Sequence, residues 1–208
     1  GGKSIRKAKK QIVKRKTHSK GGANPVLLHT LSGLMSSAVA VFPDGKKVVS
    51  VGYDKKIKIW EVESGELIKT LSNDNFLTAV AITPDGKKIL SGDTAGAVKI
   101  WDVESGKENT LYKHGTPYDS SLYSRTPWLP GHVTAVAITP DGKRVVSGSH
   151  DCTVKIWDLK NKKELFSLKH NDEQGLLQVE AVAVSAKTVV SACKCTVKIW
   201  DIESGKLL

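Results

Sequence analysis

The sequence lacks the marks of several protein classes. No apolar run in its 208 residues approaches the roughly 18 residues that a membrane-spanning helix needs. The N-terminus is charged but has no apolar segment of the kind found in secretory signals. The 3 cysteines are an odd number and do not make a disulfide framework. These absences favour a cytoplasmic protein, or a nuclear one if the host is eukaryotic.

Enzyme motifs are absent as well. The sequence has no Gly-x-Ser-x-Gly, no phosphate-binding loop and no His-Glu-x-x-His. Its 6 histidines are scattered and do not form a nucleophile–base pair with any residue that the sequence singles out. We therefore predict a protein that is not an enzyme and that carries no cofactor.

Charge is concentrated at one end of the chain. The net charge is +11, and residues 1–20 hold nine cations and no acid, which leaves +2 for the rest of the chain. The body is thus not a nucleic-acid surface by bulk charge. Two interpretations of the tail stay open: a solvated arm, or a basic helix that binds RNA or an acidic partner. The candidate residues are Lys3, Arg6, Lys7, Lys9, Lys10, Lys14, Arg15, Lys16 and Lys20.

What the sequence does contain is an internal repeat. Four segments end in nearly the same way, on Ile-Trp followed by an acid, and the tryptophans are separated by 41, 56 and 43 residues. A Pro-Asp-Gly-Lys turn occurs at 43–46, 84–87 and 140–143, with the same steps of 41 and 56. Because the tryptophans and the turns are separated by the same steps, they indicate a true repeat. The tryptophans are Trp60, Trp101, Trp157 and Trp200.

Each repeat has the pattern of β-structure. Apolar runs flank the Asp-Gly turn, which is a hairpin signal. The segment Val98–Trp101 alternates apolar and polar residues, as a half-buried strand does. A Glu-Ser-Gly turn then precedes a last strand. The pattern predicts four short strands in each unit of about 42 residues, and no helix.

These features resemble the WD40 repeat family over about residues 29–208. The resemblance implies an all-β protein, a WD40-type β-propeller whose four four-stranded blades form a partial or incomplete ring. Residues 1–28 are then a basic tail, disordered or helical. Because an open arc leaves sheet faces uncovered, we expect a larger chain or assembly. The expected blades are about 29–72, 73–113, 129–170 and 176–208, with an insertion at about 109–130.

The resemblance also implies a hydrogen-bonded network of His, Ser, Asp and Trp inside each blade, with a structural role. Blades one and three have the Ser, Asp and Trp at the family's spacing. Blade two has Ala95 where the Asp is expected, and blade four has none, so we expect these two blades to be softer. The predicted network residues are Ser50, Asp54, Trp60, Ser91, Trp101, His132, Ser147, Asp151, Trp157, Ser191 and Trp200.

Two regions are candidates for partner binding. In the family, the residues just before the network Asp line an opening where ligands dock. The insertion between blades two and three is rich in aromatic residues and proline, as binding loops often are. Ordinary variable turns, and a loop folded back on its blade, are the alternatives. The candidate residues are Tyr53, Thr94, Tyr118, Trp128, His150 and Lys194.

A metal site is not expected. Cys152 and Cys195 lie at equivalent turns of neighbouring repeats, with His150 and Cys193 beside them. Four such ligands could hold zinc, but Cys-x-Cys is tighter than the usual ligand spacing. We expect small residues that fill turns.

The leading hypothesis is a non-catalytic scaffold that presents binding surfaces to peptides or proteins. One alternative is a ribonucleoprotein component whose tail binds RNA. Another is the sensor portion of a larger signalling protein.

Overall fold

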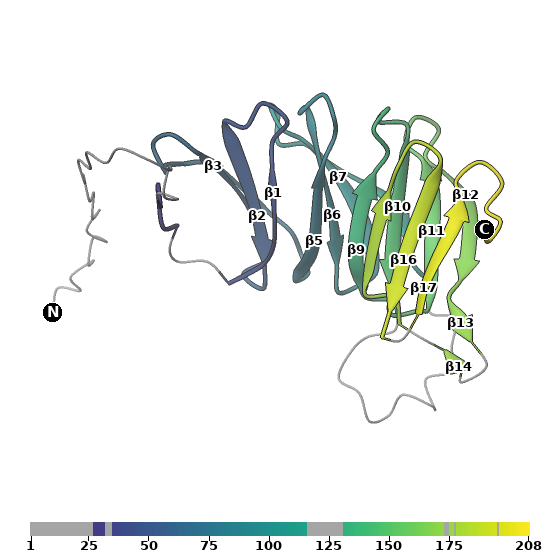
Figure 1. The fold of residues 1–208 in the computed structure, drawn as a ribbon. Helices are drawn as coiled ribbons and strands as arrows, with labels where there is room; N and C mark the ends of the chain where they lie inside the picture. The colour runs from purple at the N-terminus through teal and green to yellow at the C-terminus, as the bar shows by residue number, and fades with distance from the viewer. Residues whose placement is uncertain (1–26, 32–34, 116–130, 173–174, 177, 195) are drawn as a thin grey trace, which may run out of the picture.

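The computed structural model describes residues 27–31, 35–115, 131–172, 175–176, 178–194 and 196–208. Within these ranges the chain forms strands and turns and no helix. Four antiparallel sheets stand side by side in chain order (Figure 1), and each sheet is a simple meander of consecutive strands. The first strands of neighbouring sheets contact one another. No sheet closes on itself, and the predicted all-β partial propeller is confirmed.

The first two blades each have four strands, as predicted. The last strand of blade two extends through Lys113, so the first part of the predicted insertion at 109–130 is regular strand. Blade one consists of β1 (Ser36–Val41), β2 (Lys47–Gly52), β3 (Lys56–Glu61) and β4 (Leu67–Ser72). Blade two consists of β5 (Leu77–Ile82), β6 (Lys88–Asp93), β7 (Ala97–Asp102) and β8 (Glu108–Lys113).

Blade three is also four-stranded, and blade four has three strands. Where the fourth strand would begin, blade four has one bridge between Trp200 and Leu207. Blade three consists of β9 (Val133–Ile138), β10 (Arg144–Ser149), β11 (Thr153–Asp158) and β12 (Lys163–Lys169). A short hairpin follows, β13 (Asn171–Asp172) with β14 (Gly175–Leu176), and blade four consists of β15 (Ala181–Val184), β16 (Thr188–Cys193) and β17 (Thr196–Asp201).

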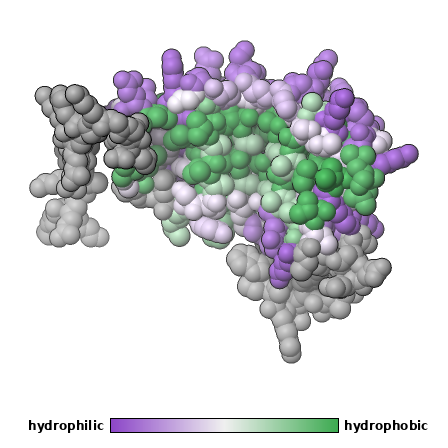
Figure 2. Space-filling view, in the orientation of Figure 1, coloured by the Kyte–Doolittle hydropathy of each residue, from purple (hydrophilic) through white to green (hydrophobic). Residues whose placement is uncertain are grey.

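The Pro-Asp-Gly-Lys segments form the turns between the first and second strands. In blade two the Asp85 carboxylate accepts hydrogen bonds from Thr83 Oγ1 at 2.6 Å and from the Lys87 N–H at 3.0 Å. Gly86 has φ +68°, a left-handed conformation that favours glycine. Hydrophilic side chains gather along this upper edge of the molecule (Figure 2).

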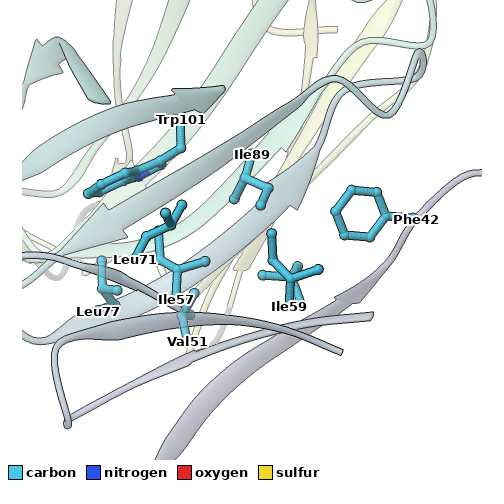
Figure 3. Packing of buried hydrophobic residues seen from close by; sticks show 9 residues of the cluster. Phe42, Val51, Ile57, Ile59, Leu71, Leu77, Ile89 and Trp101 are labelled. Atoms are coloured by element: carbon cyan, nitrogen blue, oxygen red, sulfur yellow. The ribbon is translucent and has the colours of Figure 1, made fainter. Parts of the chain in front are cut away.

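The hydrophobic core lies between the blades rather than within one sheet. Figure 3 shows the interface of blades one and two, where Ile57 and Ile59 of β3 pack with Ile89 and Trp101 of blade two. Two further clusters repeat this arrangement at the next two interfaces. Each blade therefore buries its apolar faces only against its neighbours, as stacked repeats do.

A hydroxyl on the first strand of blades one, two and three links each of these blades to the next one. Thr78 Oγ1 donates to the carbonyl of Gly92 in its own blade at 3.1 Å and to that of Val133 in the next blade at 2.5 Å. Ser37 and Thr134 make the same pair of bonds in blades one and three. In the ranges that the structure describes, no helix is long and apolar enough to cross a membrane.

Candidate interaction surface

All four blades share a buried serine–tryptophan hydrogen bond. The indole N–H of the third strand donates to a serine Oγ on the second strand, and the distances lie between 2.8 and 3.0 Å. Because antiparallel pairing places a residue pair of this kind at one register in every blade, the bond fixes the tryptophan ring over the sheet. The pairs are Ser50–Trp60, Ser91–Trp101, Ser147–Trp157 and Ser191–Trp200.

Blade three has the full four-membered network, but its histidine is His114 and not the predicted His132. The His114 ring contacts Asp151 Oδ2 through Nδ1 at 2.9 Å and Ser147 Oγ through Nε2 at 2.7 Å. Both His114 and Asp151 are buried. Burial opposes ionisation of the Asp151 carboxyl, but hydrogen bonds and charge from His114 and Thr153 hold its pKa below the usual value.

The network histidine comes from the end of the preceding blade. His114 directly follows β8, and its backbone N–H donates to the Gly96 carbonyl at 2.8 Å. Asn73 and His170 directly follow β4 and β12 and make the equivalent bonds, to Lys55 and Cys152. All three residues lie thirteen positions after the tryptophan of their own blade and are buried.

Blade two has Ala95 where the network Asp is expected, but it keeps a buried carboxylate at another position. Asp93 lies two residues before Ala95, where the family places its Asp. Its Oδ1 accepts from the backbone N–H groups of Ala95 and Ala97 at 3.0 and 2.9 Å. Its Oδ2 lies 3.3 Å from Asn73 Nδ2, so an amide takes the place of the histidine. Asp93 thus supplies the buried carboxylate that the expected position, Ala95, lacks.

Blades one and four have different polar contacts. Asp54 lies at the predicted place but pairs with Lys58 Nζ at 2.6 Å. Partial burial raises the pKa of Asp54, but the hydrogen bonds and charges of Lys58 and Lys56 together outweigh burial and hold this pKa below its usual value. In blade four, Cys193 lies where blade two has Asp93, with its Sγ 2.8 Å from Thr196 Oγ1.

The turns between second and third strands lie at one edge of the arc, which we call the 2–3 turn edge (Tyr53, Thr94, His150 and Lys194). In Figure 1 this is the lower edge, where β13 and β14 lie. The backbone N–H groups of Tyr53, Thr94 and His150 bond to the residue that precedes the first strand of the same blade. Such bonds hold the turns in place, which suits a binding surface.

An exposed aromatic pair lies on the 2–3 turn edge between blades one and two. Tyr53 is 41% exposed and Phe76 is 44% exposed, and their ring centroids are 5.8 Å apart in an edge-to-face arrangement. Lys55 Nζ lies 5.4 Å from the Phe76 ring centroid. Thr94 contacts the same residue, since its N–H donates to the Phe76 carbonyl at 3.0 Å. Phe76 thus contacts two predicted partner residues, Tyr53 and Thr94, although it lies outside the aligned turns in the sequence.

A pair of imidazoles lies on the 2–3 turn edge of blade three. The rings of His132 and His150 are 4.5 Å apart. Burial, and then the neighbouring His150, lower the pKa of His132 to about 4. Burial also lowers the pKa of His150, against the opposing charges of Glu180 and Asp151. Both rings are therefore neutral at pH 7, and neither serves as a cation for an acidic partner.

Of the remaining predicted partner residues, Lys194 is the one within the described part of the chain. Lys194 is exposed in the turn of blade four. Tyr118, Trp128 and the nine cations of residues 1–20 lie outside the described residues.

The cysteines of blades three and four do not form an evident metal site. Burial, and then the charges of Asp151 and Cys193, raise the pKa of Cys152 to about 11, so its thiol is protonated at pH 7. Among the described residues, which exclude Cys195, no group of three His, Cys, Asp or Glu could hold a metal ion. Both Cys152 and Cys193 are buried and free.

The comparisons with known proteins agree with this architecture. The model described as "WD domain, G-beta repeat" matches residues 26–61, which together with the fold defines a WD-repeat β-propeller. The model described as "Nucleolar protein 10-like, N-terminal domain" matches residues 47–208. Because that match covers well over half of the chain, the protein belongs to this family.

Individual relatives match shorter segments. WD repeat-containing protein 37 of Mus musculus is 31% identical over 120 residues, which cover 56% of this chain and 21% of that protein. Small ribosomal subunit protein RACK1 of Neurospora crassa is 49% identical over 43 residues, or 21% of this chain and 14% of that protein. The solved structure described as "Structure of U3-55K" has a TM-score of 0.69 at 25% identity and covers 87% of this chain and 53% of that chain. The chain thus spans only a fraction of the length of these proteins.

Proposed function

We propose that this protein is a non-catalytic scaffold that holds a peptide or protein partner on the 2–3 turn edge. The observation that carries the proposal is the Tyr53–Phe76 pair, two aromatic side chains left more than 40% exposed on turns that hydrogen bonds hold in place. Exposed aromatic residues on a rigid support are typical anchors of protein interfaces, because they bury a large area with few rotatable bonds.

The neighbouring charges indicate the chemistry of the partner. Lys55 Nζ lies over the Phe76 ring, and Lys194 is exposed farther along the same edge. The histidine pair between them is neutral at pH 7. The surface therefore fits an apolar anchor residue flanked by an acidic one, which would approach Lys55.

Binding to the aromatic pair is tested by selecting peptides from a display library on the immobilised chain and measuring their affinities by fluorescence anisotropy. We expect Phe76→Ala to raise the Kd of selected peptides about tenfold or more, since it truncates an anchor. Leu67→Ala is the matched control, because Leu67 is equally exposed, at 46%, but lies on β4 away from this edge. Equal loss in both variants, or no loss in Phe76→Ala, would contradict the assignment.

The names of the relatives suggest where the scaffold acts. The matching family is described as nucleolar, and one relative is named as a small ribosomal subunit protein. We infer a nuclear, and specifically nucleolar, assembly as the setting of this scaffold. Immunofluorescence of the tagged chain in its host checks this inference, and exclusion from the nucleus would refute it.

RNA binding by the tail is a second candidate function. The observation in its favour is the run of nine cations without an acid in residues 1–20. We expect RNA affinity to fall steeply with salt, with a slope of log K against log salt of about −0.7 per contacted phosphate, and to be lost when residues 1–20 are deleted. Filter binding at several salt concentrations measures both effects. Unchanged affinity after the deletion would exclude the tail.

A further inference from the structure

In blades one and three, one residue of the fourth strand holds the turn between the third and fourth strands of the next blade. This residue pairs with the isoleucine of its own third strand. In blade one it is Lys69, whose Nζ donates to the carbonyls of Val103 and Glu104 at 2.9 and 2.5 Å. In blade three it is Phe166, whose ring packs against Gly205 of blade four. The space between the strand and the neighbouring turn is therefore filled at both junctions.

The equivalent residue of blade two, Asn109, does not hold its neighbour in this way. Asn109 pairs with Ile100 in the same register, but its side chain is shorter than that of lysine or phenylalanine. The carbonyls of Leu159 and Lys160 in blade three correspond to the two that Lys69 holds in blade two. Within the described ranges, no side chain donates to either of these carbonyls. The junction of blades two and three thus lacks the contact that closes the other two.

A cavity of about 300 Å³ lies beside Asn109, on the upper edge of the molecule where hydrophilic side chains gather (Figure 2). Ile100 places the cavity on the side of blade two that faces blade three, because Ile100 packs in the hydrophobic cluster between these two blades. A volume of roughly 300 Å³ is at the lower end of the range for small-ligand sites. The lining residues are Lys88, Ile100, Asp102, Ser105, Lys107 and Asn109.

The turn of blade three at this junction departs from the repeat. Blades one, two and four have Glu-Ser-Gly here, and blade three has Lys-Asn-Lys at 160–162. Lys162 has φ +54°, the left-handed conformation that glycine adopts in the other three blades, so lysine is unfavourable for the backbone at this position. A Cβ at Gly106 would lie only 2.9 Å from Leu71 of blade one, whereas Lys162 has a whole side chain and is exposed. The turn is therefore less closely packed on blade two than its equivalent is on blade one.

Lysines surround the cavity without being neutralised by neighbouring acids. Two of them line it and two are exposed on the facing turn, and none of the four forms an ion pair within the part of the chain that the structure describes. These lysines are Lys88, Lys107, Lys160 and Lys162. The acid of the lining, Asp102, is held within its own turn, where its Oδ1 accepts from the Ser105 N–H and hydroxyl at 2.7 Å each. The cavity therefore has an excess of positive charge and, in the Asn109 amide, an available N–H donor.

We propose that this cavity binds a phosphorylated side chain in an acidic segment of a partner protein. A phosphate monoester carries about two negative charges and three acceptor oxygens, which suit two ammonium groups and an amide donor. Lys160 and Lys162 extend the positive surface beyond the cavity, so the ligand continues as an acidic chain. No aromatic side chain lines the cavity, so it offers no stacking surface to RNA bases. The site lies opposite the 2–3 turn edge and does not depend on the function proposed for that edge.

The test titrates the full chain into a fluorescein-labelled peptide, Glu-Glu-phosphoserine-Glu-Glu, and measures fluorescence anisotropy at about 150 mM salt, which screens distant charges. We expect saturable binding that is about tenfold tighter, or more, than binding of the matched peptides with serine or glutamate in place of phosphoserine. Equal affinity for the glutamate peptide would show that the site does not select phosphate and would overturn the proposal. Absence of phosphopeptide binding at millimolar concentration would also overturn it.

Two variants of the chain locate the site. Lys88→Gln combined with Lys107→Gln removes the charges that line the cavity, and Asn109→Phe fills the cavity with a ring, as blade three does, without changing the charge. We expect each variant to raise the Kd of the phosphopeptide about tenfold or more. The matched control is Lys46→Gln with Lys187→Gln, which removes the same charge from exposed turns of blades one and four. It should change the Kd by less than about twofold, because these charges are distant and screened.

Circular dichroism and thermal melting establish that the variants are folded, and the basic residues 1–20 are the same in all of them, so the contribution of these residues cancels. An equal loss of binding in the Lys46 and Lys187 control, or unchanged binding in Asn109→Phe, would show that general surface charge holds the peptide and would overturn the proposal. Tighter binding of a single-stranded RNA than of the phosphopeptide, lost in the Lys88 and Lys107 variant, would assign the cavity to RNA and would also overturn it.

Discussion

Replacing His114 with alanine is expected to lower the free energy of unfolding by about 3 kcal/mol. The imidazole bonds to Asp151 Oδ2 and to Ser147 Oγ, and all three groups are buried. Without the ring, Asp151 Oδ1 keeps the Thr153 N–H and hydroxyl, but Oδ2 loses its partner. A buried carboxylate that loses a partner costs more than the removed contact was worth. Urea denaturation measures the change, as a lower midpoint at an unchanged slope.

Two further variants make the His114 result specific. His29→Ala is the control: the His29 side chain is exposed, and its Nε2 lies 2.8 Å from the Glu63 carbonyl oxygen, so a change within about 0.5 kcal/mol is expected. His114→Asn imitates blade two, where Asn73 faces Asp93, and should recover part of the loss. If His114→Ala costs no more than His29→Ala, the network does not stabilise blade three.

The His114 network also shows how far the sequence predicts this structure. The repeat period, the Pro-Asp-Gly turns and the Ser and Trp positions follow from patterns within one blade, and the structure agrees with them. The histidine does not, because it is supplied from the end of the preceding blade. His132 directly precedes the first strand of blade three in the sequence, whereas residues 116–130 separate His114 from that blade, so the local pattern selects the wrong histidine. Counting thirteen residues forward from Trp101 finds His114. The same count from the tryptophans of blades one and three finds Asn73 and His170.

The candidate surface was predictable to a similar extent. Aligning the turns selects Tyr53 and Thr94 but not Phe76, because Phe76 precedes β5 and meets Tyr53 only when blades one and two stack. The same stacking decides which copies of a repeated sequence are exposed. Ile156 and Ile199 lie in identical hexapeptides, and only the presence of neighbouring elements separates a core residue from a surface one. Contacts between blades are therefore the part that one repeat cannot specify.

Acidification is expected to destabilise the protein between pH 6.5 and pH 4 through the His132–His150 pair. Burial first, and the His150 ring second, lower the pKa of His132 from 6.5 to about 4, against the weaker opposing effect of Asp93. In this window the unfolded chain binds a proton that the folded chain does not, so stability falls as the pH falls. The effect is absent above pH 6.5 and reaches its limit near pH 4. The shift corresponds to about 3 kcal/mol, and the lowered pKa of His150 acts in the same direction.

The pH dependence of His132→Gln isolates this contribution, because glutamine does not titrate. Urea midpoints measured from pH 7.5 to pH 4 should decline less steeply in this variant than in the parent, and His29→Gln should follow the parent. The Asp151 carboxyl acts in a different window: its pKa is lowered, so its stabilisation is present above the usual value of 3.8 and is lost only as the pH falls below it. If the urea midpoints of the parent and of His132→Gln decline in parallel above pH 4, keeping the His132 imidazole neutral in the folded state does not lower stability. The burial argument for His132 would then be wrong.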